Sequence, residues 1–331
     1  MKKNSNQGSI LILSLWILTL LTLMASSLSF YTMLRVKVLR YRMDQVVGRY
    51  LAEAGVHWAM LALATRDLDS YESLSQGWSN SPSMFKEKMV GNGKFSLSYS
   101  EIDLDLGLQT YFGIIDEERK INLNTAPKQV LLELPDSTEE IVDAIIDWRD
   151  VNPTPERKGA EKDYYQDLDI PYPAKDGPME DISELLLIKN ITPKLLEKWA
   201  DFVTIYGDGK VNVNTASREV LEMIGLDDSL IEKFMEFRHG PDELPGTEDD
   251  GSFKDEGSIA RILFEAEPLS SMETSQIINL VSKGLLGVKS KFFRVEATGM
   301  PLASLRSGRK VIAIVEHVQG DYVKIRRWLE K

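Results

Sequence analysis

The sequence predicts an α+β protein in which a long N-terminal helix packs on an antiparallel sheet and a large helical domain is inserted between the strands. Three observations support this fold class. An uncharged run near the N-terminus leads into a helical apolar pattern, strand patterns flank a long stretch that lacks them, and that stretch contains one motif twice. The chain of 331 residues is long enough for the helix and about two domains.

The N-terminal helix is predicted to begin with a run of about 26 residues, 9–34, that carries no charged side chain. At a rise of ~1.5 Å per residue this run forms a helix of about 39 Å, longer than the ~30 Å hydrocarbon core of a bilayer. Apolar residues then recur at helical spacing as far as Leu61, and no proline occurs before Pro82. We therefore expect one helix that crosses a membrane at its start and becomes amphipathic later.

Gly8 stands directly before the uncharged run, after a polar leader. Cleavage between Gly8 and Ser9 would leave the apolar helix on the mature chain, which is the arrangement of type IV prepilins. The alternative is an ordinary secretory signal that is cut near residues 25–27 and removed. The helical pattern beyond the run favours the first interpretation, because one helix then explains both halves.

Basic residues lie on both sides of the uncharged run. Lys2 and Lys3 favour an N-terminus in the cytoplasm, whereas the four basic residues that follow the run would argue for the opposite orientation if they were simply counted. We expect the N-terminus in the cytoplasm, since a large soluble domain follows. The four residues are Arg35, Lys37, Arg40 and Arg42.

The composition disfavours several function classes. The 51 acidic and 39 basic residues give a net charge of −12, which disfavours nucleic acid as a partner. The lack of cysteine excludes disulfides, thiolate metal sites and a cysteine nucleophile. The sequence has no phosphate-binding loop, G-x-S-x-G motif or paired metal histidines, so we predict that the protein is not an enzyme.

Strand patterns predict a discontinuous domain. Two candidates, 94–100 and 109–116, come before the long stretch without strand signals, and three candidates, 292–298, 311–318 and 322–328, come after it. The simplest account is one sheet whose chain is interrupted by a helical insertion. The predicted parts are a leader at 1–8, a transmembrane segment at 9–34, the first part of the sheet domain at 35–118, the inserted domain at 119–289 and the C-terminal strands at 290–331.

The inserted stretch contains a repeat. The motif INLNTA at 121–126 recurs as VNVNTA at 211–216, and a helical pattern follows each copy. Asn124 or Thr125, and their counterparts in the second copy, are expected to cap the helix that follows. The sequence therefore predicts two related helical units in tandem.

A third hairpin-like stretch, 182–206, gives the insertion a helix-hairpin-helix style. Such hairpins commonly direct backbone amides in a glycine turn at phosphates, which makes a membrane-anchored nucleic-acid receptor the alternative function. Only the turn at Gly225 has the required glycine. Together with the acidic balance, this favours a helical packing module.

Between the repeats, the segment 147–169 is rich in oxygen donors and poor in apolar residues. Calcium takes six to eight oxygen ligands, and an irregular loop can supply several of them. The candidate ligands are Asp150, Asn152, Glu161 and Asp163; the alternative is a solvated acidic loop. A second acidic loop, 242–255, contains the weaker metal candidates Glu248, Asp249, Asp250 and Gly251.

Several sequence blocks, in this order, carry a family resemblance. The first two resemble type IV pilin-like proteins, and the whole series is similar to the GspK family of large minor pseudopilins of the type II secretion system. The blocks are Gly8–Leu13, Tyr50–Gly55, Asn122–Ala126, Asp147–Asp150, Gly159–Glu161, Glu184–Leu186, Asn212–Ala216 and Phe293–Ala297.

The resemblance implies a pilin-like fold with an inserted helical domain that binds calcium, and processing by prepilin peptidase after Gly8. It implies a single-pass inner-membrane protein whose soluble domain stands in the periplasm, at the tip of a pseudopilus, with minor pseudopilins I and J and the major pseudopilin as partners. Contact with secreted substrate or the outer-membrane channel is a further expectation. A minor pilin of a type IV pilus is the related alternative.

Leu13 departs from the common pilin pattern. If Ser9 becomes the first mature residue, Leu13 is the fifth, where most proteins of the resembled class carry glutamate. That carboxylate is thought to neutralise the terminal amine of the subunit ahead, and without such a subunit it would lie unpaired in lipid at a cost of several kcal/mol. Leucine at this position therefore fits a subunit that leads the assembly.

Overall fold

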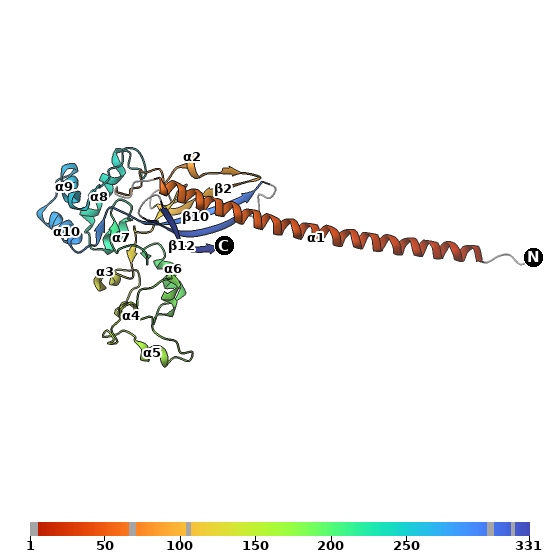
Figure 1. Cartoon of the computed structure of the whole chain (residues 1–331), viewed down its shortest axis with the longest axis horizontal. Coiled ribbons are helices and arrows are strands. Elements are labelled where there is room, and N and C mark those ends of the chain that lie inside the picture. The colour runs from red at the N-terminus through yellow and green to blue at the C-terminus, as the bar shows by residue number, and fades with distance from the viewer. Residues whose placement is uncertain (1–5, 66–70, 104–106, 303–307, 319–321) are drawn as a thin grey trace, which may run out of the picture.

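The structure is a computed structural model, and it describes residues 6–65, 71–103, 107–302, 308–318 and 322–331. A long helix, α1 (Asn6–Ala64), projects from a head in which the strands and the remaining helices gather (Figure 1). Its 59 residues correspond to about 88 Å at ~1.5 Å per residue. The single long helix expected from the apolar pattern is therefore present, and it ends three residues beyond Leu61.

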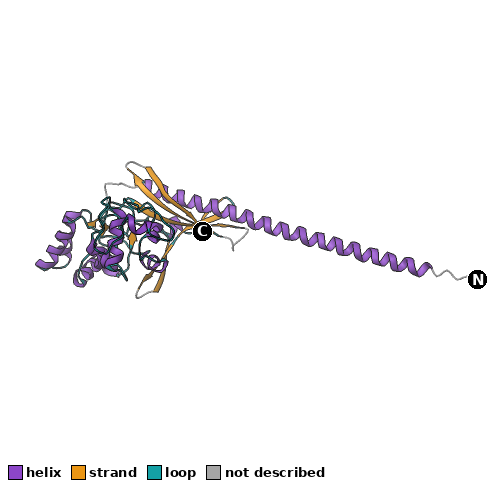
Figure 2. Ribbon diagram, turned by 90° about the horizontal axis from the view of Figure 1, so that it is seen from below, coloured by secondary structure: helices purple, strands orange, loops and turns teal. Residues whose placement is uncertain are grey.

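The head contains a six-stranded antiparallel sheet, and the C-terminal part of α1 packs against it (Figure 2). Five strands follow the order β1-β2-β10-β11-β12, and β5 pairs with β10 beyond the end of β2. Strands that come before and after the inserted helical region in the sequence therefore build one sheet. The strands are β1 (Lys88–Val90), β2 (Gly93–Leu97), β5 (Ile115–Asp116), β10 (Phe292–Pro301), β11 (Arg309–Val318) and β12 (Tyr322–Glu330), and a short helix α2 (Pro82–Phe85) precedes them.

Small residues let α1 approach the sheet closely. Ala52 and Ala59 on the helix are fully buried. A Cβ atom at Gly299 of β10 would lie 2.1 Å from the carbonyl oxygen of Gly48, so no larger residue fits there without separating helix and sheet. The same core includes Val56, Leu63, Trp78, Phe85, Leu97, Phe293, Val295, Val311 and Val315.

The two early strand candidates are each divided between two sheets. The first becomes β2 and β3 (Tyr99–Asp103), and the second becomes β4 (Gly107–Tyr111) and β5. β3 and β4 pair only with each other, and the rings of Tyr99 and Tyr111 stack at 5.4 Å. The alternation of apolar residues is unbroken at Ser98, so the local pattern did not reveal the division.

The inserted helical region consists of two units, each enclosed by a pair of two-residue parallel strands. Sequence patterns missed these strands because two residues show no period. The first unit comprises β6 (Ile121–Asn122), α3 (Lys128–Leu132), α4 (Glu139–Arg149), α5 (Lys162–Gln166), η1 (Ile182–Leu187), α6 (Pro193–Trp199) and β7 (Val203–Thr204). The second comprises β8 (Val211–Asn212), α7 (Arg218–Met223), α8 (Asp228–His239), η2 (Gly240–Asp242), η3 (Glu256–Ser258), α9 (Ile259–Ala266), α10 (Ser271–Ser282) and β9 (Leu286–Gly287).

Arginines at equivalent positions close both units. Arg149, the last residue of α4, donates to the carbonyl oxygens of Leu123 and Ala126. Arg238, near the end of α8, donates to the carbonyl oxygen of Ala216 at 2.6 Å. Burial lowers the pKa of Arg238 to about 10. Each guanidinium thus ties its helix back to the turn that follows the opening strand.

One apolar core fills both units, with Trp199, Tyr165, Phe234 and Phe253 among its largest buried side chains. All of these helices lie between β5 and β10 in the sequence, and the sheet with α1 forms the second core. The predicted fold class is confirmed: a pilin-like α+β domain with a long N-terminal helix on an antiparallel sheet and an inserted helical domain.

Candidate functional site

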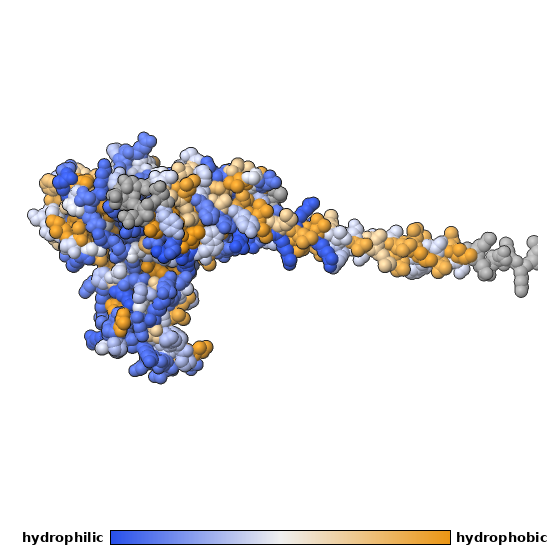
Figure 3. Space-filling model, viewed as in Figure 1, coloured by the Kyte–Doolittle hydropathy of each residue, from blue (hydrophilic) through white to orange (hydrophobic). Residues whose placement is uncertain are grey.

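The N-terminal part of α1 is a rod of exposed apolar side chains (Figure 3). Among the described residues, α1 is the one helix that is long and apolar enough to cross a membrane, and no side chain of its most apolar window is buried in the structure. A helix that is apolar on all sides is stable only when lipid or other helices cover it. The structure therefore fits a single-pass anchor that carries a soluble head.

The predicted processing and assembly residues lie at the free end of this rod. Gly8 and Ser9 are in the first turn of α1, and Leu13 follows about one turn later. The side chain of Leu13 is 61% exposed. The helix alone connects these positions to the head (Figure 1). Cleavage after Gly8 and the assembly role of Leu13 stay predictions.

Asp147, near the end of α4, organises the first acidic loop. Its side chain is fully buried, and its two carboxylate oxygens accept hydrogen bonds from the backbone N–H groups of Glu156 at 2.9 Å and Ala160 at 2.7 Å. A Cβ atom at Gly159 would lie 1.8 Å from the carboxylate, so the loop requires glycine there. Burial raises the pKa of Asp147, and the nearby carboxylates of Asp150 and Glu156 raise it further.

Glu161 lies beside this carboxylate, directly before α5. Glu161 is 9% exposed, and its Oε1 atom is buried without a hydrogen-bond partner. Burial raises the pKa of Glu161, and the carboxylates of Asp147, Asp176 and Asp150 raise it further. A buried carboxylate oxygen that has no donor and faces like charges is a position that suits a cation, so the residues fit the expected metal.

The structure places the four predicted ligands unequally. Asp150 and Glu161 belong to the same acidic cluster. Asn152 donates its side-chain amide to Asp150 at 2.7 Å and accepts the backbone N–H of Thr154 with its oxygen at 3.0 Å. Asp163 is exposed and lines the same cleft, of about 440 Å³, as Glu161.

Sequence reasoning missed Asp176, which lines this cleft from beyond α5. Asp147 was recognised as one of the oxygen donors of the segment but was not selected as a ligand. The fold brings Asp176 to Glu161 across a turn that has no regular period. A signal was nevertheless present, because Asp176 precedes a glycine in a stretch of prolines and acidic residues.

The second acidic loop also gathers carboxylates. Oxygen atoms of Asp242, Asp249 and Asp250 lie within 4.8 Å of one another, so Asp242 rather than Glu248 completes the group. Donors already reach each of these carboxylates: the Thr247 hydroxyl donates to Asp249 at 2.7 Å, the backbone N–H of Gly246 to Asp250 at 2.8 Å and that of Leu244 to Asp242 at 2.9 Å. The hydrogen bond from Thr247 lowers the pKa of Asp249. This loop is stabilised by its own hydrogen bonds.

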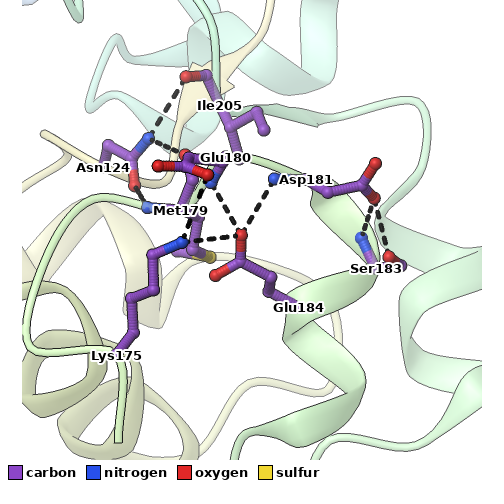
Figure 4. Close-up of polar contacts among 8 residues, drawn as sticks. All are labelled: Asn124, Lys175, Met179, Glu180, Asp181, Ser183, Glu184 and Ile205. Carbon is purple, nitrogen blue, oxygen red and sulfur yellow. Dashed lines mark hydrogen bonds and ion pairs between the residues drawn. The ribbon is translucent and has the colours of Figure 1, made fainter. Parts of the chain in front are cut away.

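Residues 179–181, which lie between the first acidic loop and η1, are held by Glu184 and Asn124 (Figure 4). One oxygen of Glu184 accepts the backbone N–H groups of Glu180 at 2.8 Å and Asp181 at 3.0 Å, and the ammonium group of Lys175 lies 3.3 Å away. Asn124 accepts the N–H of Met179 at 2.8 Å and donates to the Met179 carbonyl at 3.0 Å. The first repeat motif thereby positions the chain that follows the acidic loop.

Asn214 plays the same part in the second unit. It accepts the N–H of Phe253 and donates to the carbonyl of Phe253, both at 2.8 Å. The expectation that the motif residues cap the following helices was therefore wrong. Ser217 caps α7, and Pro127 precedes α3 without a side-chain cap. In each motif the side chain of the first asparagine accepts the backbone N–H of the second, and the side chain of the second asparagine binds a distant loop.

Where the chain leaves the sheet, the charged sequence DEERK at 116–120 is almost fully buried. The carboxylate of Asp116 accepts hydrogen bonds from Asn212 at 3.0 Å, Thr215 at 2.6 Å and Ser290 at 2.7 Å. Burial raises the pKa of Asp116. One carboxylate thus connects the sheet, the second unit and the segment that returns to β10.

The neighbouring charged residues Glu117, Glu118 and Lys120 bind the first helical unit and the start of β10. Glu118 accepts the backbone N–H groups of Lys291 at 2.5 Å and Phe292 at 3.1 Å, and burial raises its pKa to about 7. Lys120 donates to the carbonyl of Ala200 at 2.9 Å. Glu117 accepts the hydroxyl of Thr204 at 2.9 Å. This charged junction (residues 116–120) therefore anchors both helical units to the sheet.

Comparisons with known proteins were made for the whole chain. Residues 128–208 match the family described as Type II secretion system (T2SS), protein K. Residues 7–57 match the family described as PilX N-terminal. No curated protein matches the chain.

A chain of the crystal structure of the GspK-GspI-GspJ complex from the enterotoxigenic Escherichia coli type 2 secretion system has a similar fold. The TM-score is 0.58 at 16% sequence identity, over 91% of this chain and 99% of that chain. The matches confirm the resemblance to protein K of the type II secretion system that the sequence motifs carry.

Proposed function

We propose that this protein is a minor pseudopilin of the protein K type, which works without catalysis at the tip of the type II secretion pseudopilus, where it initiates or caps assembly and supports protein export. The observation that carries the proposal is the position of the helical units, which lie at the end of the molecule opposite the N-terminus (Figure 1). Subunits of a filament stack along their long helices. A domain of this bulk beyond the end of α1 would obstruct a subunit above it, but not one below.

The N-terminal end of α1 supports the same position. Cleavage by prepilin peptidase between Gly8 and Ser9 would leave the apolar rod in the inner membrane, with the head in the periplasm. A leading subunit has no neighbour ahead whose terminal amine needs a carboxylate, which agrees with Leu13. The exposed apolar side chains of α1 would pack laterally against the helices of neighbouring subunits.

The proposed partners are the minor pseudopilins I and J, with the major pseudopilin below them. The solved chain of similar fold comes from a complex of GspK with GspI and GspJ. Secreted substrate or the outer-membrane channel would meet the acidic head from above. Nucleic acid is a poor partner for a chain with a net charge of −12.

Calcium is the proposed cofactor of the first acidic loop. Glu161, Asp150 and Asp176 would supply carboxylate oxygens, with Asp147 beside them. Two observations support this: the Oε1 atom of Glu161 is buried without a donor, and the three aspartates raise the pKa of Glu161. A bound divalent cation would replace the mutual repulsion of these carboxylates with attraction. It would thereby stabilise the segment between α4 and η1 against unfolding.

Site-directed crosslinking of the full chain in cells tests the tip position. The chain has no cysteine, so a single cysteine is unique. Met272→Cys lies on α10 in the helical domain with 76% of its surface exposed, and Tyr50→Cys lies on α1 with 64% exposed. We expect Tyr50→Cys to crosslink to neighbouring pseudopilins and Met272→Cys to give no crosslink with the major pseudopilin. Crosslinking of both positions to the major pseudopilin would contradict a tip position.

Copurification tests the partners. The full chain, solubilised in detergent and coexpressed with pseudopilins I and J, should purify with both. The major pseudopilin expressed alone with the chain is the matched comparison, and it should purify in smaller amounts. Recovery of the chain without I and J would contradict the proposal and would favour the type IV pilus alternative.

A further inference from the structure

Four basic residues follow the uncharged run on α1: Arg35, Lys37, Arg40 and Arg42. We call them the basic collar. The first acidic residue of the chain is Asp44, so the helix has no carboxylate of its own below the collar. Among the described residues, none of the four collar residues forms an ion pair. Four cations therefore stand on an exposed helix without counter-charges.

The collar residues surround the helix. At about 100° per residue, Arg35 and Arg42 lie within about 20° of each other, because seven residues separate them. Lys37 and Arg40 point about 140° to 200° away from Arg35, on the opposite side. A partner helix contacts only one face of α1. Lipid headgroups surround a membrane helix on all sides, so the placement on two sides favours lipid.

The height of the collar agrees with this partner. The run of about 26 uncharged residues spans about 39 Å, between the ~30 Å hydrocarbon core and the ~40–45 Å that includes the headgroups. The collar therefore begins in the headgroup layer. The guanidinium group of Arg35 lies 4.2 Å from the centre of the Tyr31 ring, and aromatic residues concentrate at this interface.

We propose that the basic collar binds the phosphate groups of anionic phospholipids in the leaflet on the side of the head, and so sets the depth of α1 in the membrane. The inference rests on the proposed membrane anchor. Arginine and lysine both bind phosphate oxygens through charge-assisted hydrogen bonds.

The test uses the full chain in nanodiscs of phosphatidylcholine with about one third phosphatidylglycerol. A fluorophore on Met43→Cys reports the lipids around the collar, since residue 43 is 68% exposed and the chain has no other cysteine. Its quenching by headgroup-labelled phosphatidylglycerol is compared with its quenching by headgroup-labelled phosphatidylcholine. We expect a ratio above about five, which is the local enrichment that a single basic residue produces at an anionic surface, because four such residues act together. The ratio should fall with added salt.

Two double variants test whether both sides of the helix bind anionic lipid. R35Q/R42Q removes one side of the collar and K37Q/R40Q removes the other. Each should lower the ratio by a similar factor, and the fourfold variant should bring it to about one. K283Q/K324Q, which removes two exposed charges from the head, is the matched control and should leave the ratio unchanged. If one double variant removed the whole enrichment, lipid would bind one side of the helix only, and the two-sided collar would be contradicted.

A second readout separates failure of the collar from failure of the anchor. Trp16 is the one tryptophan within residues 9–34, so acyl-chain brominated phosphatidylcholine should quench it if α1 is inserted. Quenching of Trp16 together with a ratio of one would overturn only the collar. Loss of Trp16 quenching would overturn the anchor and, with it, this inference.

Discussion

The hydroxyl group of Thr215 donates a 2.6 Å hydrogen bond to the carboxylate of Asp116, although 99 residues separate them. The same carboxylate oxygen accepts hydrogen bonds from Asn212 and Ser290. Burial removes water from a carboxylate, which destabilises the folded chain unless hydrogen-bond donors replace that water. Each of these three hydrogen bonds therefore offsets part of the desolvation cost of Asp116. The orientation of the helical domain on the sheet therefore depends on a few buried polar groups.

Thr215→Val should destabilise the head by about 2 kcal/mol, because it removes one of the three side-chain donors from a buried charged acceptor. Thr110→Val is the matched control. Thr110 is exposed and its contact with Ser100 is long, at 3.4 Å, so we expect a change within about 0.5 kcal/mol. Urea unfolding of the full chain in detergent, followed by tryptophan fluorescence, measures both. Equal effects of the two substitutions would contradict the assigned role of Asp116.

The raised pKa of Glu118 predicts that the head loses stability as the pH rises. Its pKa is about 7 in the folded chain, against 4.5 for an ordinary glutamate. Between these two pH values the folded chain holds a proton that the unfolded chain has released, so the free energy of unfolding falls as the pH rises, by about 3 kcal/mol in total. Asp116, whose pKa is also raised, adds to the fall.

Glu118→Gln should remove most of this pH dependence, whereas Glu133→Gln, at an exposed position, should preserve it. Unfolding in urea at several values between pH 5 and pH 8 provides the measurement. A slope that is unchanged in Glu118→Gln would show that another group titrates.

Substitution of Asn124 and of Asn214 should each speed hydrogen exchange in a different loop. Asn124→Ala should expose the backbone near Met179, and Asn214→Ala should expose the backbone near Phe253, because each asparagine makes two hydrogen bonds with that residue. Two lost bonds correspond to about tenfold or more faster hydrogen exchange. Hydrogen-exchange mass spectrometry of both variants measures this. Faster exchange in the loop of the other unit would contradict the assignment.

We expect substitution of Glu161 to lower the stability of the chain in calcium and to raise it in chelator. With calcium at about 100 times its dissociation constant, the unmodified chain should gain about 2.7 kcal/mol. Glu161→Gln should lose that gain, yet be more stable than the unmodified chain when calcium is chelated, because it removes repulsion from neighbouring carboxylates. Asp167→Asn, at an exposed position in the same loop, should behave like the unmodified chain. Thermal unfolding with calcium and with chelator distinguishes these outcomes.

Gly8→Ala should block maturation, so that the chain keeps its leader. Ala25→Leu should not block it, although this substitution disrupts the alternative cleavage region of an ordinary signal. Mass spectrometry of the purified chain gives the first residue directly. A mature chain that begins near Ser27, or one that is cut normally in Gly8→Ala, would contradict the prepilin interpretation.

Patterns within a few residues predicted much of the fold. The apolar spacing that ends at Leu61 predicted α1, and the three late strand candidates are β10, β11 and β12. Repeated motifs predicted where the two helical units begin. The division of residues 94–100 between β2 and β3 was not predicted, because pairing partners rather than local alternation decide it.

Candidate site residues were predictable only in part. The acidic segment was visible as composition, and Asp150 and Glu161 do lie in one cluster. Asp176 was missed because the turn that brings it to Glu161 has no period. The buried junction at residues 116–120 was also missed, since five consecutive charged residues indicate an exposed segment unless their partners are known.

The sequence by itself determined the apolar rod, the class of the fold, the tandem motifs and the family resemblance, because these depend on side-chain character and spacing over short distances. Only the tertiary structure decided which carboxylates are buried, that Asn124 and Asn214 bind loops rather than cap helices, and how the charged junction holds the helical domain. The physical reason is that burial and hydrogen-bond partners arise between residues far apart in the chain, as Asp116 and Thr215 are.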